Sequence, residues 1–219
     1  EFQKDRFDIN FESQTGIIGG THKLALSERT LWQTTLAASA LESTRTASRL
    51  GSSFQLTKLE EDQYNQSKIS FTTSLSHRLN ERNRLNGGVF VTRHGYDILS
   101  EDQITQSIAI GEGSGTLIQP YINWQTNLAP QLRLDAGLHY AYFTFNETQA
   151  VEPRAALSYF LANGQKLSLA YGLHSQLQLP QLYFAQVAEG NPNEGLDFTK
   201  AHHLVLGYEY ALNRSTVLS

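Results

Sequence analysis

The sequence predicts an all-β fold in which about ten long amphipathic strands pair antiparallel as a segment of a transmembrane β-barrel. Three observations carry this prediction. Apolar and polar residues alternate along most of the chain, connections are short at one end of the predicted sheet and mostly longer at the other, and aromatic residues gather near the short connections. Successive side chains of a strand point to opposite faces, so the alternation gives each strand one apolar face.

The alternation is clearest in 116–128, where Ile118, Ile122 and Trp124 share one face and Gln119 and Asn123 share the other. The same period appears, in chain order, at 6–12, 21–27, 31–41, 69–79, 84–98, 132–142, 151–161, 167–174 and 204–212. Several of these segments exceed the ~5–6 residues of an ordinary strand. They approach the ~9–11 residues with which a steeply tilted strand crosses a bilayer.

Turn-forming residues separate the alternating segments. Short turns rich in Asn, Gly and Pro are predicted at 27–29, 80–83, 129–131, 163–165 and 213–215. Longer connections are predicted at 43–65, 100–114 and 177–196, and brief ones near 16–20 and 146–148. The glycine-rich 111–115 precedes a strand, so we expect a flexible external loop and not a phosphate cradle. Short periplasmic turns opposite longer extracellular loops are typical of outer-membrane barrels.

Aromatic residues of the apolar face lie within a few residues of the short turns. Amphipathic rings prefer the membrane–water interface, and barrels carry a girdle of them at each interface. The predicted membrane girdle consists of Trp32, Trp124, Tyr159, Tyr208 and Tyr210. A soluble β-sandwich would instead bury such residues in its core, so their exposure separates the two architectures.

The opposite face of the strands carries amides, charges and histidines. In a barrel this face lines the lumen, where such groups can hold a plug or pass a polar solute. The predicted lumen-facing residues are Gln119, Tyr121, Asn123, Arg133, Asp135, His139, Glu152, Arg154, His174 and Glu209. Glu152 and Arg154 lie two residues apart on this face, and we expect a wet ion pair worth under ~1 kcal/mol.

The composition removes several function classes. The chain has 219 residues, a formal net charge of −4 and no cysteine. The slightly acidic balance argues against a nucleic-acid partner, and the missing cysteine removes disulfides and thiolate metal sites. No apolar run reaches the length of a transmembrane helix. Methionine and a signal peptide are also missing, and we expect 1–219 to be part of one longer β-barrel domain.

No set of residues converges on catalysis or metal binding. Adjacent strand residues point to opposite faces, so His202 and His203 cannot bind one ion together, with one expected at the interface and one in the lumen. His174 and Ser175 diverge for the same reason, and no hydrolytic pair is expected. The acidic run 60–62 lacks the spaced ligands of a calcium loop and is expected to be a solvated loop. We predict no enzyme, no metal site and no cofactor.

The connection 177–196 is the predicted place of ligand contact. Its aromatic and amide side chains suit polar ligands with apolar faces, and binding residues concentrate on loops. The candidate ligand-binding residues are Tyr183, Phe184, Gln186, Asn191 and Asn193. An equal alternative is that this loop packs on its neighbours.

Several segments resemble parts of the TonB-dependent outer-membrane receptor barrels of Bacteroidetes. They are AVEPRAALSYFL (150–161), KLSLAYGLHSQLQLPQLYF (166–184), LDFTKAHHLVLGYEYAL (196–212) and, as a loop-to-strand element, LEEDQYNQSKISFTTSLSHRLN (59–80). The resemblance covers most of the chain from Leu59 onward and is more specific in its last third. It concerns barrel segments and not catalytic motifs.

The resemblance implies a barrel of ~22 strands around an N-terminal plug, in the outer membrane of a Gram-negative bacterium. It implies uptake of a scarce solute (siderophore, glycan, peptide or vitamin) captured by extracellular loops. The implied partners are outer-membrane lipid, the protein's own plug domain, the TonB complex and a small solute, and a surface lipoprotein is left open. The plug and the closing C-terminal strand are expected outside this chain.

Two other interpretations remain open at this point. The first is a small complete outer-membrane barrel that acts as an adhesin or a hydrolase. The second is a soluble β-sandwich binding domain, which would bury the face that carries Ile118, Ile122 and Trp124.

Overall fold

The computed structural model describes residues 6–102, 107–186, 193–211 and 217–218. The long strands are β1 (Phe7–Ser27), β2 (Thr30–Leu50), β3 (Leu56–Arg78), β4 (Asn83–Asp102), β5 (Ser107–Ala129), β6 (Leu132–Phe143), β7 (Thr148–Phe160), β8 (Gln165–Gln176) and β10 (Thr199–Ala211). The short elements are the 3-10 turn η2 (Ala162–Gly164), helix α1 (Pro180–Phe184) and strands β9 (Ala185–Gln186) and β11 (Val217–Leu218). None of the described helices is long and apolar enough to cross a membrane.

All described strands belong to one antiparallel sheet. Its order is β1-β2-β3-β4-β5-β6-β7-β8-β10-β11, and β9 pairs with β5. The predicted antiparallel all-β fold is therefore confirmed. Over the described residues the sheet is open, with β1 at one edge and β11 at the other.

Several strands are longer than the hydrophobic alternation predicts. β1 runs unbroken through 16–20, so the brief connection predicted there is wrong. β2 and β3 leave only 51–55 as a turn, so the long connection predicted at 43–65 is wrong as well, and its acidic run 60–62 lies within β3. β4 and β5 likewise take up most of 100–114. These extensions are polar on much of their surface, so they keep the backbone ladder while losing the apolar alternation.

The sheet has two chemically different faces. We call the face that carries Leu36, Phe71 and Ile122 the outer face, and the opposite one the inner face. Outer-face residues are uncharged throughout the segments 32–40, 69–75, 85–91, 118–124, 134–140, 151–159, 167–173 and 204–208. Ile122 and Trp124 remain 49% and 41% exposed, because no second described layer covers them. A β-sandwich would have buried them.

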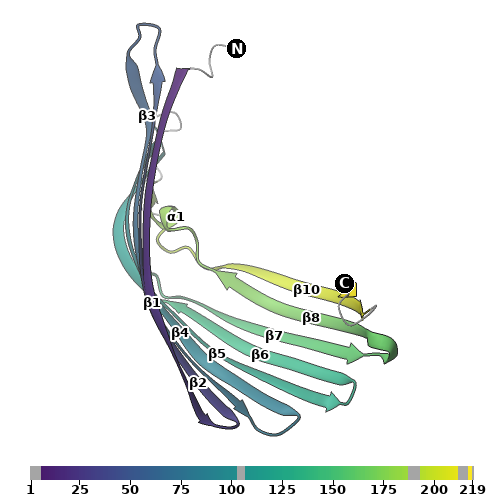
Figure 1. Cartoon of the computed structure of the whole chain (residues 1–219). Coiled ribbons are helices and arrows are strands. Elements are labelled where there is room, and N and C mark those ends of the chain that lie inside the picture. Colours follow the sequence, from purple (N-terminus) through teal and green to yellow (C-terminus); the bar gives the residue numbers. More distant parts are fainter. Residues whose placement is uncertain (1–5, 103–106, 187–192, 212–216, 219) are drawn as a thin grey trace.

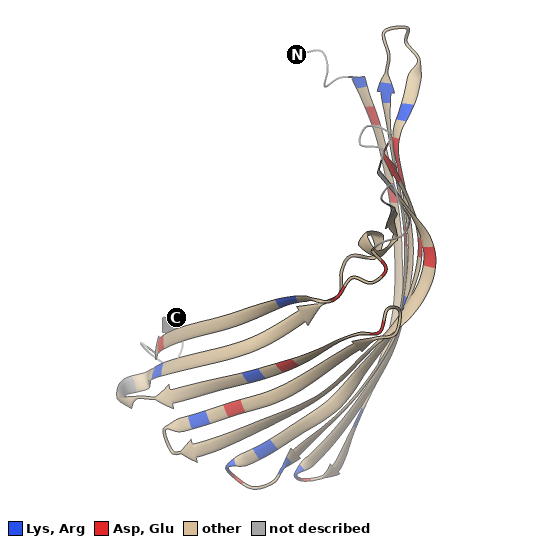
Figure 2. Cartoon of the chain, turned by 180° about the vertical axis from the view of Figure 1, so that it is seen from behind, with Lys and Arg blue, Asp and Glu red and all other residues tan. Residues whose placement is uncertain are grey.

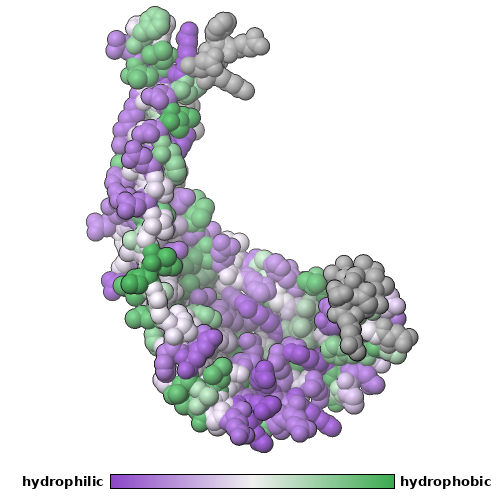
Figure 3. Space-filling model, in the orientation of Figure 1, coloured by the Kyte–Doolittle hydropathy of each residue, from purple (hydrophilic) through white to green (hydrophobic). Residues whose placement is uncertain are grey.

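The sheet curves into an open trough with one tall side (Figure 1). β1–β5 rise together as a high wall, whereas β6, β7, β8 and β10 are shorter and end lower. The short turns that the sequence predicts at 27–29, 80–83, 129–131 and 163–165 gather along the lower rim, whereas 213–215 lies outside the described residues. Hydrophilic side chains predominate where Figure 3 looks into the hollow of the trough.

A compact core lies on the inner face of the wall. The connection between β8 and β10, here called the β8–β10 loop (described over 177–186 and 193–198), folds inward onto β4, β5 and β6. Its buried residues form one cluster with residues of β4, β6 and β7: Tyr96, Ile98, Ala141, Phe143, Ala150, Tyr183, Phe184 and Phe198. The loop is therefore packed on the wall and not held out in solvent.

Three glycines of β5 make this packing possible. Gly111, Gly113 and Gly115 alternate along the inner face, and a Cβ on Gly111 would overlap the ring of Phe184. A Cβ on Gly115 would lie 2.5 Å from the ring of Phe143. The glycines thus form a flat track on which aromatic rings lie against the backbone. The flexible external loop predicted at 111–115 is wrong, because these residues belong to a strand.

Candidate functional site

A pocket of about 580 Å³ lies between the β8–β10 loop and the inner face of the wall. We call it the inner pocket. The wall contributes Leu41, Ser43, Tyr64, Gln66, Lys68, His94, Tyr96, Leu117 and Gln119, and the other side consists of 175–181 and Phe198. Because residues two apart on a strand share a face, four neighbouring strands present these side chains together.

The roof of the inner pocket is fixed at both ends. On one side, α1 is held in place because its residues Tyr183 and Phe184 pack in the aromatic core. On the other, the Asn146 side chain donates to the carbonyl oxygens of Glu194 at 3.1 Å and Leu196 at 2.7 Å. Gln178 donates to the carbonyl oxygen of Asp197 at 3.0 Å and to the Thr199 hydroxyl at 2.7 Å. The pocket is therefore formed in advance of any ligand.

The chemistry of the inner pocket is amide-rich with aromatic surfaces. Its lining amides are Gln66, Gln119, Gln176, Gln178 and Gln181. Lys68 lies opposite His94 in the β3–β4 ladder. The His94 ring stacks on Tyr96 with a centroid distance of 5.9 Å, and its buried Nε2 has no hydrogen-bond partner among the described residues. The pocket can thus present both donors and acceptors beside flat apolar surfaces.

The residues predicted for ligand contact in the β8–β10 loop have different placements. Tyr183 and Phe184 are 2% and 4% exposed; the Tyr183 ring contacts Phe143 of β6, and the Phe184 ring contacts Tyr96 of the wall. Gln186 belongs to β9, which pairs with β5, and Asn193 begins a turn before Leu196. Asn191 lies outside the described residues. The loop therefore packs on its neighbours, and the pocket it encloses is lined by 175–181.

All ten predicted lumen-facing residues lie on the inner face, as the strand registers show. Gln119 lines the inner pocket, and Tyr121 stacks on Phe90 with ring centroids 5.3 Å apart. A second pocket lower on the same face includes Asn123, Asp135, Arg154 and His174. Arg133 pairs with Asp135 at 3.0 Å, and Glu209 pairs with Lys166 at 2.8 Å.

Glu152 is the centre of a buried polar group on the inner face. Its carboxylate accepts the backbone N–H of Ser175 at 3.0 Å and the Ser175 hydroxyl, and it contacts Arg154 and His139. The expected ion pair with Arg154 is present, but Glu152 is 2% exposed, so its carboxylate is buried and not wet. Burial occurs because β7 separates from β8 beyond Arg154 and Gly172, which lets Ser175 turn toward the carboxylate.

The adjacent histidines of β10 diverge. The outer-face His202 lies 2.9 Å from the Tyr171 hydroxyl, whereas the inner-face His203 lies edge-on to His174 with centroids 4.9 Å apart. Ser175 contacts Glu152 and not His174. Over the described residues, no group of three or more His, Cys, Asp or Glu side chains is placed to hold a metal ion.

The outer face carries the predicted girdle at the turn end of the sheet. Trp32 donates its indole N–H to Thr73 at 2.8 Å, and Trp124 donates to Asn83 at 3.0 Å. Tyr159 and Tyr208 are about half exposed on the same face. Tyr210 follows Tyr208 by two residues and is less exposed.

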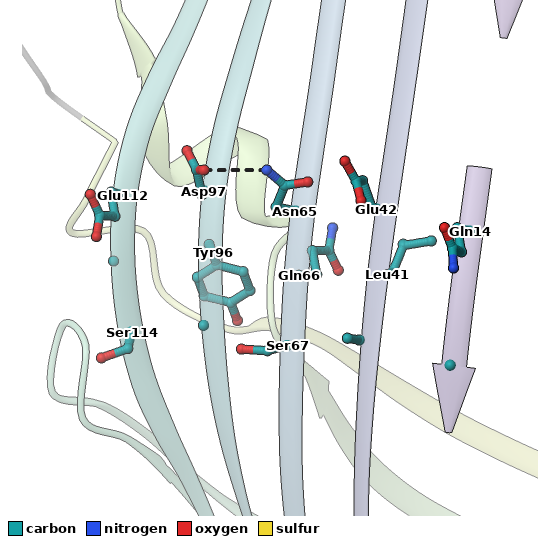
Figure 4. A pocket seen from close by; sticks show the side chains of 14 residues that line it. Gln14, Leu41, Glu42, Asn65, Gln66, Ser67, Tyr96, Asp97, Glu112 and Ser114 are labelled. Atoms are coloured by element: carbon teal, nitrogen blue, oxygen red, sulfur yellow. Dashed lines mark hydrogen bonds between the residues drawn. The ribbon is translucent and has the colours of Figure 1, made fainter. Parts of the chain in front are cut away.

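A wider groove of about 1000 Å³ crosses the outer face of the wall above the uncharged segments. Figure 4 views it with α1 behind the sheet. A ladder row of small residues, Gly16, Ala40, Ser67, Gly95 and Ser114, forms its floor, and the next row is Gln14, Glu42, Asn65, Asp97 and Glu112. Figure 2 shows acidic residues along this wall and basic ones at its upper end and near the lower turns, and the described lining of the groove holds Glu42, Asp97 and Glu112 but no Lys or Arg. The groove is therefore acidic, unlike the inner pocket.

Sequence reasoning missed the wall side of the inner pocket. Tyr64, Gln66 and Lys68 lie in a segment that it partly assigned to a loop, and His94 was only one polar residue of a weak strand. A usable signal exists in hindsight, because Gln66, Lys68 and Ser70 alternate with Ser67 and Ile69. Continuing that alternation upward would have placed Tyr64 and Lys68 on the inner face.

No family model matches the chain, and no curated protein matches its sequence. The fold is similar to the RagAB peptide importer in its closed-closed state, with a TM-score of 0.61 and 10% identity over 94% of this chain and 29% of that one. A second RagAB peptide transporter structure gives a TM-score of 0.60 and 11% identity, with the same coverage. BauA, the ferric preacinetobactin receptor from Acinetobacter baumannii, gives 0.58 and 14% identity over 94% of this chain and 36% of that one.

These similarities describe a fold. The chain spans about a third of the length of the structures it matches. What it shares with them is a barrel-like antiparallel β architecture, and the likeness does not single out the Bacteroidetes type that the sequence resembles.

Proposed function

We propose that this chain is part of the barrel of a TonB-dependent outer-membrane receptor, which takes up a scarce solute and does no chemistry on it. The observation that carries the proposal is the uncharged outer face, which stays exposed over segments such as 118–124. A protein in water rarely exposes so large an apolar surface, whereas lipid requires it. The girdle residues at its lower margin fit the same environment.

The open sheet supports a larger barrel. In lipid each backbone N–H and C=O must be paired, so a spanning sheet has to close. The edges at β1 and β11 then pair with strands outside this chain, in line with the third of the matched structures that it spans. The inner face would line the lumen around a plug domain. The Bacteroidetes type, the TonB complex and a surface lipoprotein remain parts of the proposal.

The inner pocket is the proposed place of solute contact. It lies at the upper, extracellular end of the lumen face, enclosed by a loop that is already folded. Siderophores, glycans, peptides and vitamins are the candidate solute classes. Pre-formed pockets with a few polar groups and aromatic walls suit such ligands.

Localisation and uptake test this proposal together. We expect the native protein in the outer-membrane fraction, with an intact mass several-fold above that of 219 residues. Deleting its gene should abolish growth on one limiting nutrient, and loss of TonB should have the same effect. A native mass near that of 219 residues, or a protein found free of membranes, would overturn the proposal.

A further inference from the structure

The inner face carries a surplus of unpaired positive charge. The inner-face carboxylates Glu60, Asp62, Asp135, Glu152 and Glu209 each lie within ion-pair distance of a cation. By contrast, the inner-face cations Lys23, Lys68, Arg78 and Arg84 form no ion pair within the described part of the chain. A cation without a partner on a concave surface attracts anions, and low-dielectric walls focus that field.

Lys68 is the unpaired cation at the inner pocket. No Asp or Glu lines this pocket, so Lys68 is its one formally charged side chain among the described lining residues. The nearest imidazole is His94, which lies opposite it in the ladder and has an unpartnered buried Nε2. An anionic group placed here would meet an ammonium and face no carboxylate.

The rest of the pocket suits the neutral body of a ligand. Gln66 lies two residues from Lys68 on β3, and Gln119 of β5 and Gln178 of the roof line the same pocket. Primary amides donate and accept hydrogen bonds at once, so they fit hydroxyl or peptide groups equally. The Tyr64 and Tyr96 rings supply flat apolar surfaces beside them.

We infer that the inner pocket binds a small solute through a carboxylate held by Lys68, with the neutral hydrogen-bonding remainder of the solute held by the glutamine amides. This inference rests on the proposed transport function and names the chemical class of its solute. The carboxylate can come from the C-terminus of a short peptide or from an acidic sugar. A neutral solute would leave Lys68 without a partner.

The test compares matched probes that differ in one charge. Calorimetric titration of the native protein in detergent would use N-acetyl-trialanine with a free C-terminus against its C-terminal amide. A second pair would be trigalacturonic acid against its methyl ester. In at least one pair we expect the acid to bind about tenfold or more tightly than its neutral partner, as charge-assisted hydrogen bonds do. Selectivity in the first pair alone assigns a peptide, and selectivity in the second alone assigns an acidic sugar.

Substitutions then locate the charge. Lys68→Gln should remove the preference for the acid, and Lys68→Arg should keep it. Lys23→Gln is the matched control, because Lys23 is another unpaired inner-face cation, in β1 near the lower turns, and does not line the pocket. Lys68 is exposed, so the exchange removes no packed atoms, and unchanged heat-dependent gel migration would confirm folding.

Three outcomes would overturn the inference: equal binding of acid and neutral probes in both pairs, an acid preference that survives in Lys68→Gln, or the same loss in Lys23→Gln. Failure of the proposed function is separately visible. If the protein supports TonB-dependent growth but Lys68→Gln leaves the binding preference unchanged, the proposed function stands and only the inference about this pocket fails. A protein absent from the outer membrane loses the function whatever its binding data.

Discussion

The carboxylate of Glu152 accepts the backbone N–H of Ser175 at 3.0 Å, at the place where β7 and β8 stop pairing. Pro153 follows Glu152 directly and has no N–H to donate to a ladder. The buried side chain therefore joins the two strands where the backbone ladder ends. It also contacts Arg154 of its own strand and lies 3.0 Å from His139 Nδ1, so one carboxylate touches groups from three strands.

Removing this carboxylate should destabilise the barrel. Glu152→Ala leaves the Ser175 N–H and the Arg154 side chain without their partner, although Arg154 is partly exposed and can be hydrated. We expect a loss of about 2 kcal/mol in the free energy of unfolding. Urea unfolding in detergent, followed by tryptophan fluorescence, would measure it. Glu209→Ala is the control, and its half-exposed pair with Lys166 should cost under ~1 kcal/mol. Equal losses of unfolding free energy in the two variants would contradict the stabilising role of the buried Glu152 carboxylate.

The glycine track should hold α1 in place. Gly111→Ala puts a methyl group into the ring of Phe184, which must move away. We expect overpacking to cost about 1–3 kcal/mol and to release the β8–β10 loop, with at least tenfold faster proteolytic cleavage there. The added change Phe184→Ala should relieve the clash without restoring the packing. Gly20→Ala, where nothing lies within 4 Å of the new methyl group, should leave cleavage unchanged.

Opposite faces of β5 should respond differently to charge. Ile122 lies on the outer face and Asn123 on the inner face, one residue apart. Ile122→Arg should cost about 1–2 kcal/mol of folding free energy in lipid vesicles, because Ile122 lies between the girdle residue Trp124 and the bilayer midplane, while Asn123→Arg should fold nearly normally. The folded fraction is read from heat-dependent gel migration. If both variants fold equally well, the outer face does not contact lipid.

The packing of α1 should weaken at high pH. Burial raises the pKa of Tyr183 above its ordinary value of 10.0. The released loop therefore loses its tyrosine proton first, so the stability of the packed form is complete below about pH 10 and falls as pH rises from there. Limited proteolysis between pH 8 and pH 11 should show increasing cleavage of the loop. Tyr183→Phe removes the ionisable hydroxyl, and its cleavage should not rise with pH.

The antiparallel fold was predictable because it depends on a local signal. Residues such as Ile118, Ile122 and Trp124 reveal a strand face by spacing alone, and each strand pairs with the next one along the chain. The upper halves of β1–β5 escaped prediction because both of their faces carry polar groups. Only the backbone hydrogen bonds between strands continue through these upper halves, and the side-chain pattern does not reveal such bonds directly.

The site was less predictable because it depends on distant pairs. The sequence alone predicts that Gly111 lies in a loop. Its role as a flat strand position becomes clear only from the Phe184 ring that lies against it. The sequence alone places the Glu152 carboxylate in contact with water. Its burial becomes clear only from the end of the β7–β8 pairing next to it. The girdle, by contrast, follows from turn position and face, both of which are local. Lys68 shows the same limit, since its missing partner is a property of three neighbouring strands.

The height of the wall determines how far its upper tip would project beyond a membrane. A strand of 23 residues such as β3, tilted by ~40°, rises ~60 Å, and only ~25 Å of that height matches the apolar layer of a membrane. The tip at 51–55 would then stand ~30 Å clear of the lipid on a paired, stiff stalk. In the proposed outer-membrane location, a large particle approaching from outside would touch this tip before it reached the mouth of the lumen.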